Sequence, residues 1–205
     1  MGRVRGKEWM QEHVADRFVQ RARAEGRRSR AAFKLAEIAQ RDRLLAPGMT
    51  VVDLGAAPGG WSQVAKERVG TRGRVIALDA LDMPGIPGVI FIRGDFRDEN
   101  VVIELERALG GQKIDLVLSD LSPNFSGIAA ADQARALALA ELAREFALKH
   151  LKPQGNLLVK LFQGEGYEGY LKDLRHRFQA VNARKPEASR ARSSEVYLVA
   201  KGLRP

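Results

Sequence analysis

The stretch VVDLGAAPGGWS, residues 51–62, has an acidic residue and several glycines at the end of an apolar run. This pattern is typical of a buried strand that enters a nucleotide-binding turn. The stretch almost matches two phosphate-binding motifs, but each of them lacks one required residue. Trp61 stands where a P-loop requires lysine, and Ala57 stands where a dinucleotide loop requires its middle glycine. The loop therefore favours a nucleoside ligand without phosphates, and S-adenosylmethionine is the common one, although a plain glycine-rich turn would look the same.

Aspartates follow four of the apolar runs, at Asp53, Asp79, Asp95 and Asp120. One aspartate at a strand end is weak evidence, because turns favour this residue. The carboxyl ends of parallel strands meet at one edge of a sheet, however, and ligands bind there. Four carboxylates at that edge indicate a site. Asp79 follows the glycine loop by about 20 residues, where an acidic side chain accepts hydrogen bonds from ribose hydroxyls.

Lys160 is unusual because it interrupts the apolar run LLVKLF. Lysine is almost never buried without a partner, and burial disfavours its charged form, which makes this residue a candidate general base. A lysine whose long stem reaches solvent is an equally simple interpretation. Lys34, which follows Phe33, could lie on an exposed helix face, and Glu195 could be an ordinary charge at the start of a strand.

Apolar and amphipathic segments alternate between these residues. Apolar runs predict strands at 49–55, 74–80, 89–95, 113–120, 155–163 and 194–202. Helical spacing predicts helices at 29–45, capped by Ser29, and at 61–70, 99–111, 131–151 and 167–178. Strand–helix alternation with apolar strands predicts an α/β fold, in which helices cover both faces of a parallel sheet.

Composition restricts the class of protein. A chain of 205 residues with 45% hydrophobic and 29% charged residues fits one soluble domain. No apolar run approaches the roughly 18 residues of a membrane span, and the start resembles no secretory signal, so we expect a cytoplasmic protein. The absence of cysteine excludes disulfides, thiolate metal sites and cysteine nucleophiles. The three histidines are scattered, so we expect no metal.

The positive charge is concentrated in two segments. Residues 1–30 hold nine Lys/Arg against four Asp/Glu, and residues 184–192 hold four against one. These excesses of +5 and +3 account for nearly all of the net charge of +9. A localised basic surface is what binding to a phosphate backbone requires. The pattern favours a nucleic-acid partner over two merely solvated segments.

Five motifs, in order between Ser29 and Lys201, resemble those of one family. SRAAFKL, DLGAAPGGWSQV, DLSPN, LVKLFQG and RSSEVYLVAKG are similar to the motifs of the FtsJ/RrmJ-type (RlmE) ribosomal RNA large subunit 2′-O-ribose methyltransferases. The resemblance implies a Rossmann-like S-adenosylmethionine-dependent methyltransferase fold, whose seven-stranded sheet is mostly parallel with its last strand antiparallel. Phe33 replaces a frequent tyrosine of the family.

The resemblance also implies the site residues. The catalytic tetrad would be Lys34, Asp120, Lys160 and Glu195. The S-adenosylmethionine contacts would be Gly59, Trp61, Asp79, Asp95 and Asp120.

The implied reaction is 2′-O-methylation of one uridine in the A loop of 23S rRNA, within the large ribosomal subunit. Lys160 would be the general base, no metal would be needed, and the protein would act as a monomer. Residues 1–28 would form a basic extension that contacts RNA, and residues 29–205 the catalytic domain. Two alternatives stay open: ribose methylation of transfer RNA or another RNA, and a non-catalytic RNA-binding ribosome-assembly factor.

Overall fold

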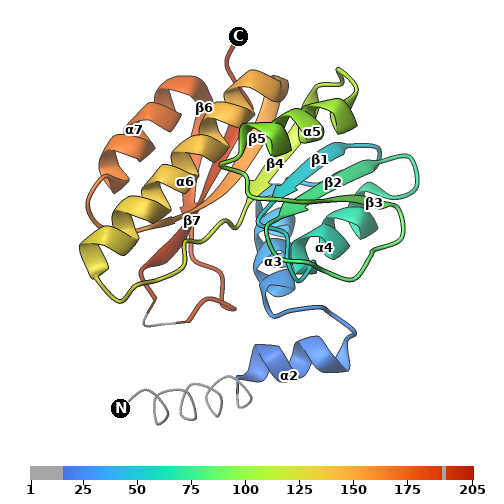
Figure 1. Ribbon diagram of the computed structural model, residues 1–205, viewed down its shortest axis with the longest axis horizontal. Helices are drawn as coiled ribbons and strands as arrows, with labels where there is room; N and C mark the ends of the chain where they lie inside the picture. Colours follow the sequence, from blue (N-terminus) through green and yellow to red (C-terminus); the bar gives the residue numbers. More distant parts are fainter. Residues whose placement is uncertain (1–15, 191–192) are drawn as a thin grey trace.

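A seven-stranded sheet forms the centre of the computed structural model, which describes residues 16–190 and 193–205 (Figure 1). The strand order is β3-β2-β1-β4-β5-β7-β6. Neighbouring strands are parallel except β7, which is antiparallel to both β5 and β6. The predicted fold class is confirmed. The strands are β1 (Thr50–Leu54), β2 (Arg74–Asp79), β3 (Val89–Arg93), β4 (Ile114–Ser119), β5 (Leu151–Phe162), β6 (Phe178–Arg184) and β7 (Glu195–Leu203).

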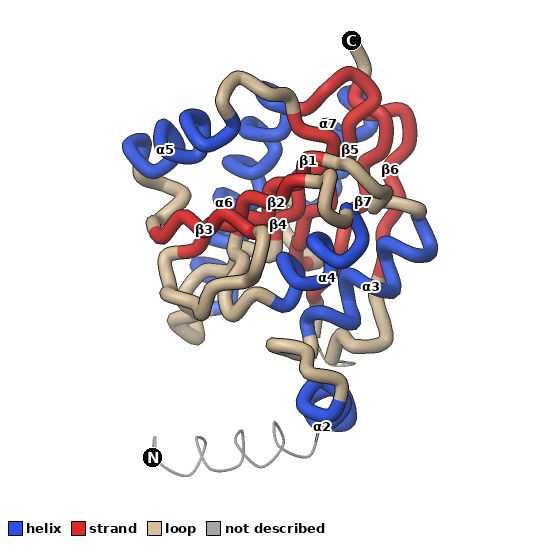
Figure 2. Tube along the Cα trace, turned by 90° about the vertical axis from the view of Figure 1, so that its right-hand side faces the viewer, coloured by secondary structure: helices blue, strands red, loops and turns tan. Residues whose placement is uncertain are grey.

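Helices cover both faces of the sheet, as the apolar strands require. α3 and α4 pack on one face and α5, α6 and α7 on the other, and Figure 2 shows strands between the two layers. Each face has its own buried cluster because successive strand residues point to opposite sides. Leu158 thus packs beneath α3 and α4, whereas Leu157 faces α6 and α7. The helices are α2 (Arg17–Ala24), α3 (Ala31–Asp42), α4 (Gly60–Val69), α5 (Glu99–Leu109), α6 (Ala129–His150) and α7 (Tyr167–Arg177).

β1 and β4 lie side by side at the point where the strand order reverses. From β1 the chain adds β2 and β3 on one side, and β4 and β5 then extend the sheet on the other. Loops that leave these strands diverge, and ligands of open α/β sheets bind in the resulting crevice. The aspartates singled out in the sequence lie at the ends of β1 and β2 or just after β3 and β4, so the topology brings them to one edge of the sheet.

Several predicted boundaries were wrong. α3 begins at Ala31 rather than at a Ser29 cap, and it ends at Asp42 because Arg43 adopts a left-handed conformation with φ 52°. The Ser29 hydroxyl is instead buried against the start of α4, where a Cβ on Gly60 would come within 2.5 Å of it. β6 was missed because it is a largely exposed edge strand without a clear apolar pattern.

α2 lies at one end of the molecule, beyond the sheet (Figures 1 and 2). Asp16 caps it by accepting a hydrogen bond from the Phe18 amide at 2.9 Å. Phe18 packs on Phe33 of α3 with ring centroids 5.8 Å apart, which holds α2 against α3. The predicted RNA-contacting extension, residues 1–28, is described only from residue 16 onward. In the described part of the chain, no helix is long and apolar enough to cross a membrane.

Candidate active site

The glycine loop after β1 is shaped by close backbone approach. Gly55 has φ 79°, and a Cβ there would lie 2.8 Å from the backbone nitrogen of Leu121. Only glycine therefore allows the loop to lie against the end of β4. Gly59 has φ 104° and precedes α4, whose first amides have no acceptors within the helix. The loop offers a bent backbone with little side-chain bulk, which suits close approach of a ligand.

Asp79 lies beside this loop at the end of β2. Its Oδ2 accepts a hydrogen bond from the Ala57 amide at 2.9 Å, and its Oδ1 accepts one from the Leu81 amide at 2.8 Å. Each carboxylate oxygen has further capacity to accept. The hydrogen bond to Ala57 thus joins Asp79 to the loop that carries Gly59, another predicted cofactor residue.

Asp95 and Trp61 make different contacts from the other predicted cofactor residues. Asp95 is partly exposed and pairs with Arg97 at 2.6 Å, and the hydrogen bonds from that guanidinium hold its pKa below the usual value. The Trp61 indole is 2% exposed, and its Nε1 donates to the Ala31 carbonyl at 2.8 Å. Its ring anchors α4 to α3, so any contact of Trp61 with a cofactor would come from its backbone.

Asp53, at the end of β1, is fully buried beneath the glycine loop. Its Oδ2 accepts from the Ser62 hydroxyl at 2.6 Å, whereas its Oδ1 has no partner in the described part of the chain. Burial, with smaller contributions from Asp120 and Asp79, raises its pKa to about 7. A buried carboxylate oxygen without a donor is costly, and protonation of the Asp53 carboxyl group relieves that cost.

The four predicted catalytic residues form two ion pairs. Lys34 of α3 lies 2.6 Å from Glu195 Oε1 at the start of β7. Lys160 of β5 lies 3.1 Å from Asp120 Oδ1 and donates to the Asp120 carbonyl at 2.8 Å. Tyr197 joins the pairs, because its hydroxyl accepts from Lys34 at 3.1 Å and donates to Asp120 Oδ1 at 3.1 Å. The structure brings all four residues into one network.

Burial gives this network its electrostatic character. The side chains of Lys34, Lys160 and Glu195 are 11%, 8% and 13% exposed. Burial alone would raise the pKa of Glu195, but the charge and hydrogen bond of Lys34 outweigh it and lower that pKa. Burial and the nearby Asp120 carboxylate raise the pKa of Tyr197 well above its usual value. The phenol is therefore protonated at neutral pH and acts as a hydrogen-bond relay.

Sequence reasoning missed Tyr197. A signal was present, since residues two apart on a strand share one face and Tyr197 follows Glu195 by two positions. In the antiparallel β5–β7 ladder, Tyr197 lies opposite Lys160 and Glu195 lies opposite Phe162. These residues become neighbours only because β5 pairs with β7, and the sequence alone does not predict that pairing.

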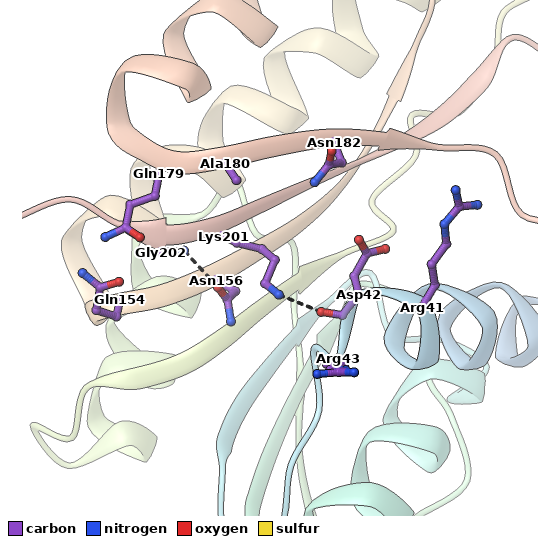
Figure 3. A pocket seen from close by; sticks show the side chains of 10 residues that line it. All are labelled: Arg41, Asp42, Arg43, Gln154, Asn156, Gln179, Ala180, Asn182, Lys201 and Gly202. Atoms are coloured by element: carbon purple, nitrogen blue, oxygen red, sulfur yellow. Dashed lines mark hydrogen bonds between the residues drawn. The ribbon is translucent and has the colours of Figure 1, made fainter.

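A cavity of about 630 Å³ lies elsewhere, at the opposite edge of the sheet. Figure 3 shows its cations and side-chain amides, with Lys201 donating to the Asp42 carbonyl at 2.8 Å and the Gly202 amide donating to Asn156 at 3.0 Å. None of the predicted site residues lines this cavity. Among the described residues, no group of three or more His, Cys, Asp or Glu side chains could hold a metal ion.

The glycine loop after β1 and the two lysine–carboxylate pairs beside it are the arrangement expected of a Rossmann-like methyltransferase. Comparison with known proteins agrees. The chain belongs to the FtsJ-like methyltransferase family, whose model matches residues 27–203. It is 58% identical to the ribosomal RNA large subunit methyltransferase E of Stenotrophomonas maltophilia, over 96% of this chain and 93% of that protein. It is 59% identical to the protein of the same name from Azoarcus sp., over 97% of both.

A solved structure has a similar fold. A Plasmodium falciparum protein described as a ribosomal RNA methyltransferase superposes with a TM-score of 0.78 and 31% identity. The match covers 86% of this chain and 98% of that one. The fold thus recurs in a related protein.

Proposed function

We propose that this protein transfers a methyl group from S-adenosylmethionine to a ribose 2′-hydroxyl of large-subunit ribosomal RNA, at a uridine in the A loop of 23S rRNA. The observation that carries the proposal is the buried network of Lys34, Asp120, Lys160 and Glu195 beside the glycine loop. The names of its curated relatives support ribosomal RNA of the large subunit as the substrate.

The crevice residues fit the cofactor. Gly55 and Gly59 remove side-chain bulk from the loop, and Asp79 has free acceptor capacity for ribose hydroxyls. Asp95 and the backbone of Trp61 would complete the set. The bound cofactor supplies an activated methyl group on a sulfonium, so the proposed reaction needs no metal.

Lys160 is the proposed general base. A neutral amine has two N–H donors and one lone pair. Two oxygens of Asp120, its carbonyl and Oδ1, lie 2.8 and 3.1 Å from Nζ and can accept both donors. The lone pair is then left for the proton of the ribose hydroxyl. Asp120 is thus expected to orient the amine.

Lys34 has the complementary role. A charged amine has three donors, and Glu195 and the Tyr197 hydroxyl accept two of them at 2.6 and 3.1 Å. The third is available to stabilise negative charge that develops on the ribose oxygen as its proton leaves. The ion pair with Glu195 holds the Lys34 amine in place. In-line alignment of oxygen, methyl and sulfur supplies much of the remaining rate enhancement.

The basic extension up to residue 28 and the loop before Glu195 are proposed to bind RNA outside the carboxylate-rich crevice. Several arginines of the predicted basic segments already have partners within the protein. Arg184 binds both oxygens of Asp42 at 2.9 and 2.7 Å, and Arg27 and Arg30 pair with Glu67 and Asp16. Arg192 lies outside the described residues. We expect a monomeric, cytoplasmic enzyme whose partner is the large ribosomal subunit.

Mapping of ribose methylation tests the function directly. Large subunits from cells that lack the protein are incubated with the enzyme and S-adenosylmethionine, and the RNA is hydrolysed with alkali. One linkage should resist hydrolysis, because a methylated 2′-oxygen cannot attack its phosphate. Methyl transfer to RNA without a resistant linkage would refute ribose as the acceptor. Transfer to transfer RNA but not to large subunits would correct the substrate.

A further inference from the structure

Phe125 is an exposed aromatic residue beside the catalytic network. It lies in the loop between β4 and α6 and is 60% exposed. Its ring meets that of Phe162 with centroids 5.8 Å apart at an interplanar angle of 85°. Because the two rings are nearly perpendicular, at least one face of Phe125 is not covered by Phe162. The solvent-exposed face of Phe125 therefore does not pack in the hydrophobic core.

Phe162 connects this ring to the proposed base. The Lys160 Nζ lies 6.0 Å from the Phe162 ring centroid, and Phe162 lies opposite Glu195 in the β5–β7 ladder. Phe162 and Lys160 are two residues apart on β5, so their side chains share one face of the sheet. The Phe125–Phe162 pair therefore borders the position at which a ribose hydroxyl would meet Lys160.

The turn that follows Phe125 is fixed by a buried carboxylate. Asp132 of α6 is 7% exposed, and it accepts hydrogen bonds from the Ser126 amide and hydroxyl, both at 2.8 Å. It also accepts from the Gly127 amide at 2.9 Å and pairs with Arg135. These contacts hold the turn without any ligand, and a pre-organised turn reduces the entropic cost of binding.

We propose that Phe125, backed by Phe162, is a stacking platform for an unpaired nucleobase of the RNA, next to the ribose that is methylated. The inference rests on the proposed ribose methyltransferase function and assigns a substrate subsite to it. Aromatic side chains bind splayed bases in this way because every base has a π-face. A single exposed ring beside a buried lysine is about the size of one nucleobase. A protein partner would need a broader apolar surface.

Binding of two short RNA probes tests the platform without requiring catalysis. One probe is a single-stranded oligouridylate, and the other is an abasic oligoribonucleotide of the same length. The wild-type protein should prefer the first, and Phe125→Ala should remove most of that preference, about tenfold. Phe125→Trp should keep it, whereas Phe125→Leu, which is apolar but lacks a π-face, should not.

Ile128→Ala is the matched control, because Ile128 is 65% exposed on the same turn. It should leave the preference unchanged, and all four variants should keep the wild-type melting temperature. Equal affinity of the wild type for both probes, or an equal loss in Ile128→Ala, would overturn the platform. Methyl transfer assays report separately on the proposed function, because Phe125→Ala should raise the KM for large subunits more than it lowers kcat. Inactivity of the wild type on RNA would refute the reaction while leaving the probe result to stand.

Discussion

The Tyr197 hydroxyl donates a hydrogen bond to Asp120 Oδ1 across 3.1 Å, and through it the two lysine–carboxylate pairs become one network. The same hydroxyl accepts from Lys34, so it connects the proposed oxyanion stabiliser with the carboxylate that orients the proposed base. A single buried phenol on β7 thus connects α3 with the residue that follows β4. Its protonation state is secured, since burial raises its pKa well above the usual value.

Tyr197→Phe should lower kcat by about 10- to 100-fold, the effect of losing hydrogen bonds to charged partners. The ring is fully buried and packs on Trp61 with centroids 5.7 Å apart, so the variant should keep its fold. Single-turnover methyl transfer measures the loss, and calorimetric titration of S-adenosylmethionine is the control. A Phe variant with wild-type kcat would show that the relay has no catalytic role.

Asp53→Asn should change how stability depends on pH. The folded-state pKa of Asp53 is raised from 3.8 to about 7, so its contribution to stability is complete below about pH 4 and is lost as pH rises through about 7. The asparagine variant cannot ionise. Its melting temperature relative to wild type should therefore increase between about pH 5 and about pH 8. A difference that stays constant over this range would contradict an ionising buried carboxylate.

S-adenosylmethionine should raise the melting temperature, and NAD and ATP should not. The glycine loop lacks the lysine of a P-loop and the middle glycine of a dinucleotide loop. It therefore should not bind the phosphates of NAD or ATP. Thermal unfolding with each ligand in excess measures the shift. Asp79→Ala should reduce the shift through loss of the ribose acceptor. Stabilisation by NAD alone would contradict the assignment of the crevice.

The basic segments should govern salt-dependent RNA binding. Arg190 lies in the loop that leads to Glu195, and Arg190→Gln together with Arg192→Gln should weaken RNA binding while leaving cofactor affinity unchanged. Each lost phosphate contact should flatten the log–log salt slope by about 0.7 to 0.9.

Deletion of residues 1–24 should have the same effect on RNA binding without unfolding the sheet. Arg72→Gln is a suitable control, because Arg72 is exposed in the turn before β2, at the opposite edge. Unchanged affinity and slope in both test variants would mean that RNA binds elsewhere.

The α/β class and the strand-end aspartates could be predicted from local pattern. The family motifs selected the four residues of the proposed tetrad, which lie in one network, and their catalytic roles stay a prediction. Edge strand β6 was not predicted, since a mostly exposed strand lacks the apolar run that identifies a buried one. Contacts between residues far apart in the sequence could not be predicted either. Arg184 was assigned to a free basic surface but binds Asp42, and the Tyr197 relay depends on the β5–β7 register.

Single-turnover methyl transfer by Lys160→Arg tests the central claim most directly. Arginine keeps the positive charge but does not lose its proton under physiological conditions. Lys160→Ala and Lys160→Arg should therefore both fail to methylate large subunits, while each still binds S-adenosylmethionine and unfolds cooperatively. Lys34→Arg, which preserves the charge that a stabiliser needs, should keep measurable activity. Wild-type activity in Lys160→Arg would contradict a deprotonating lysine at this position.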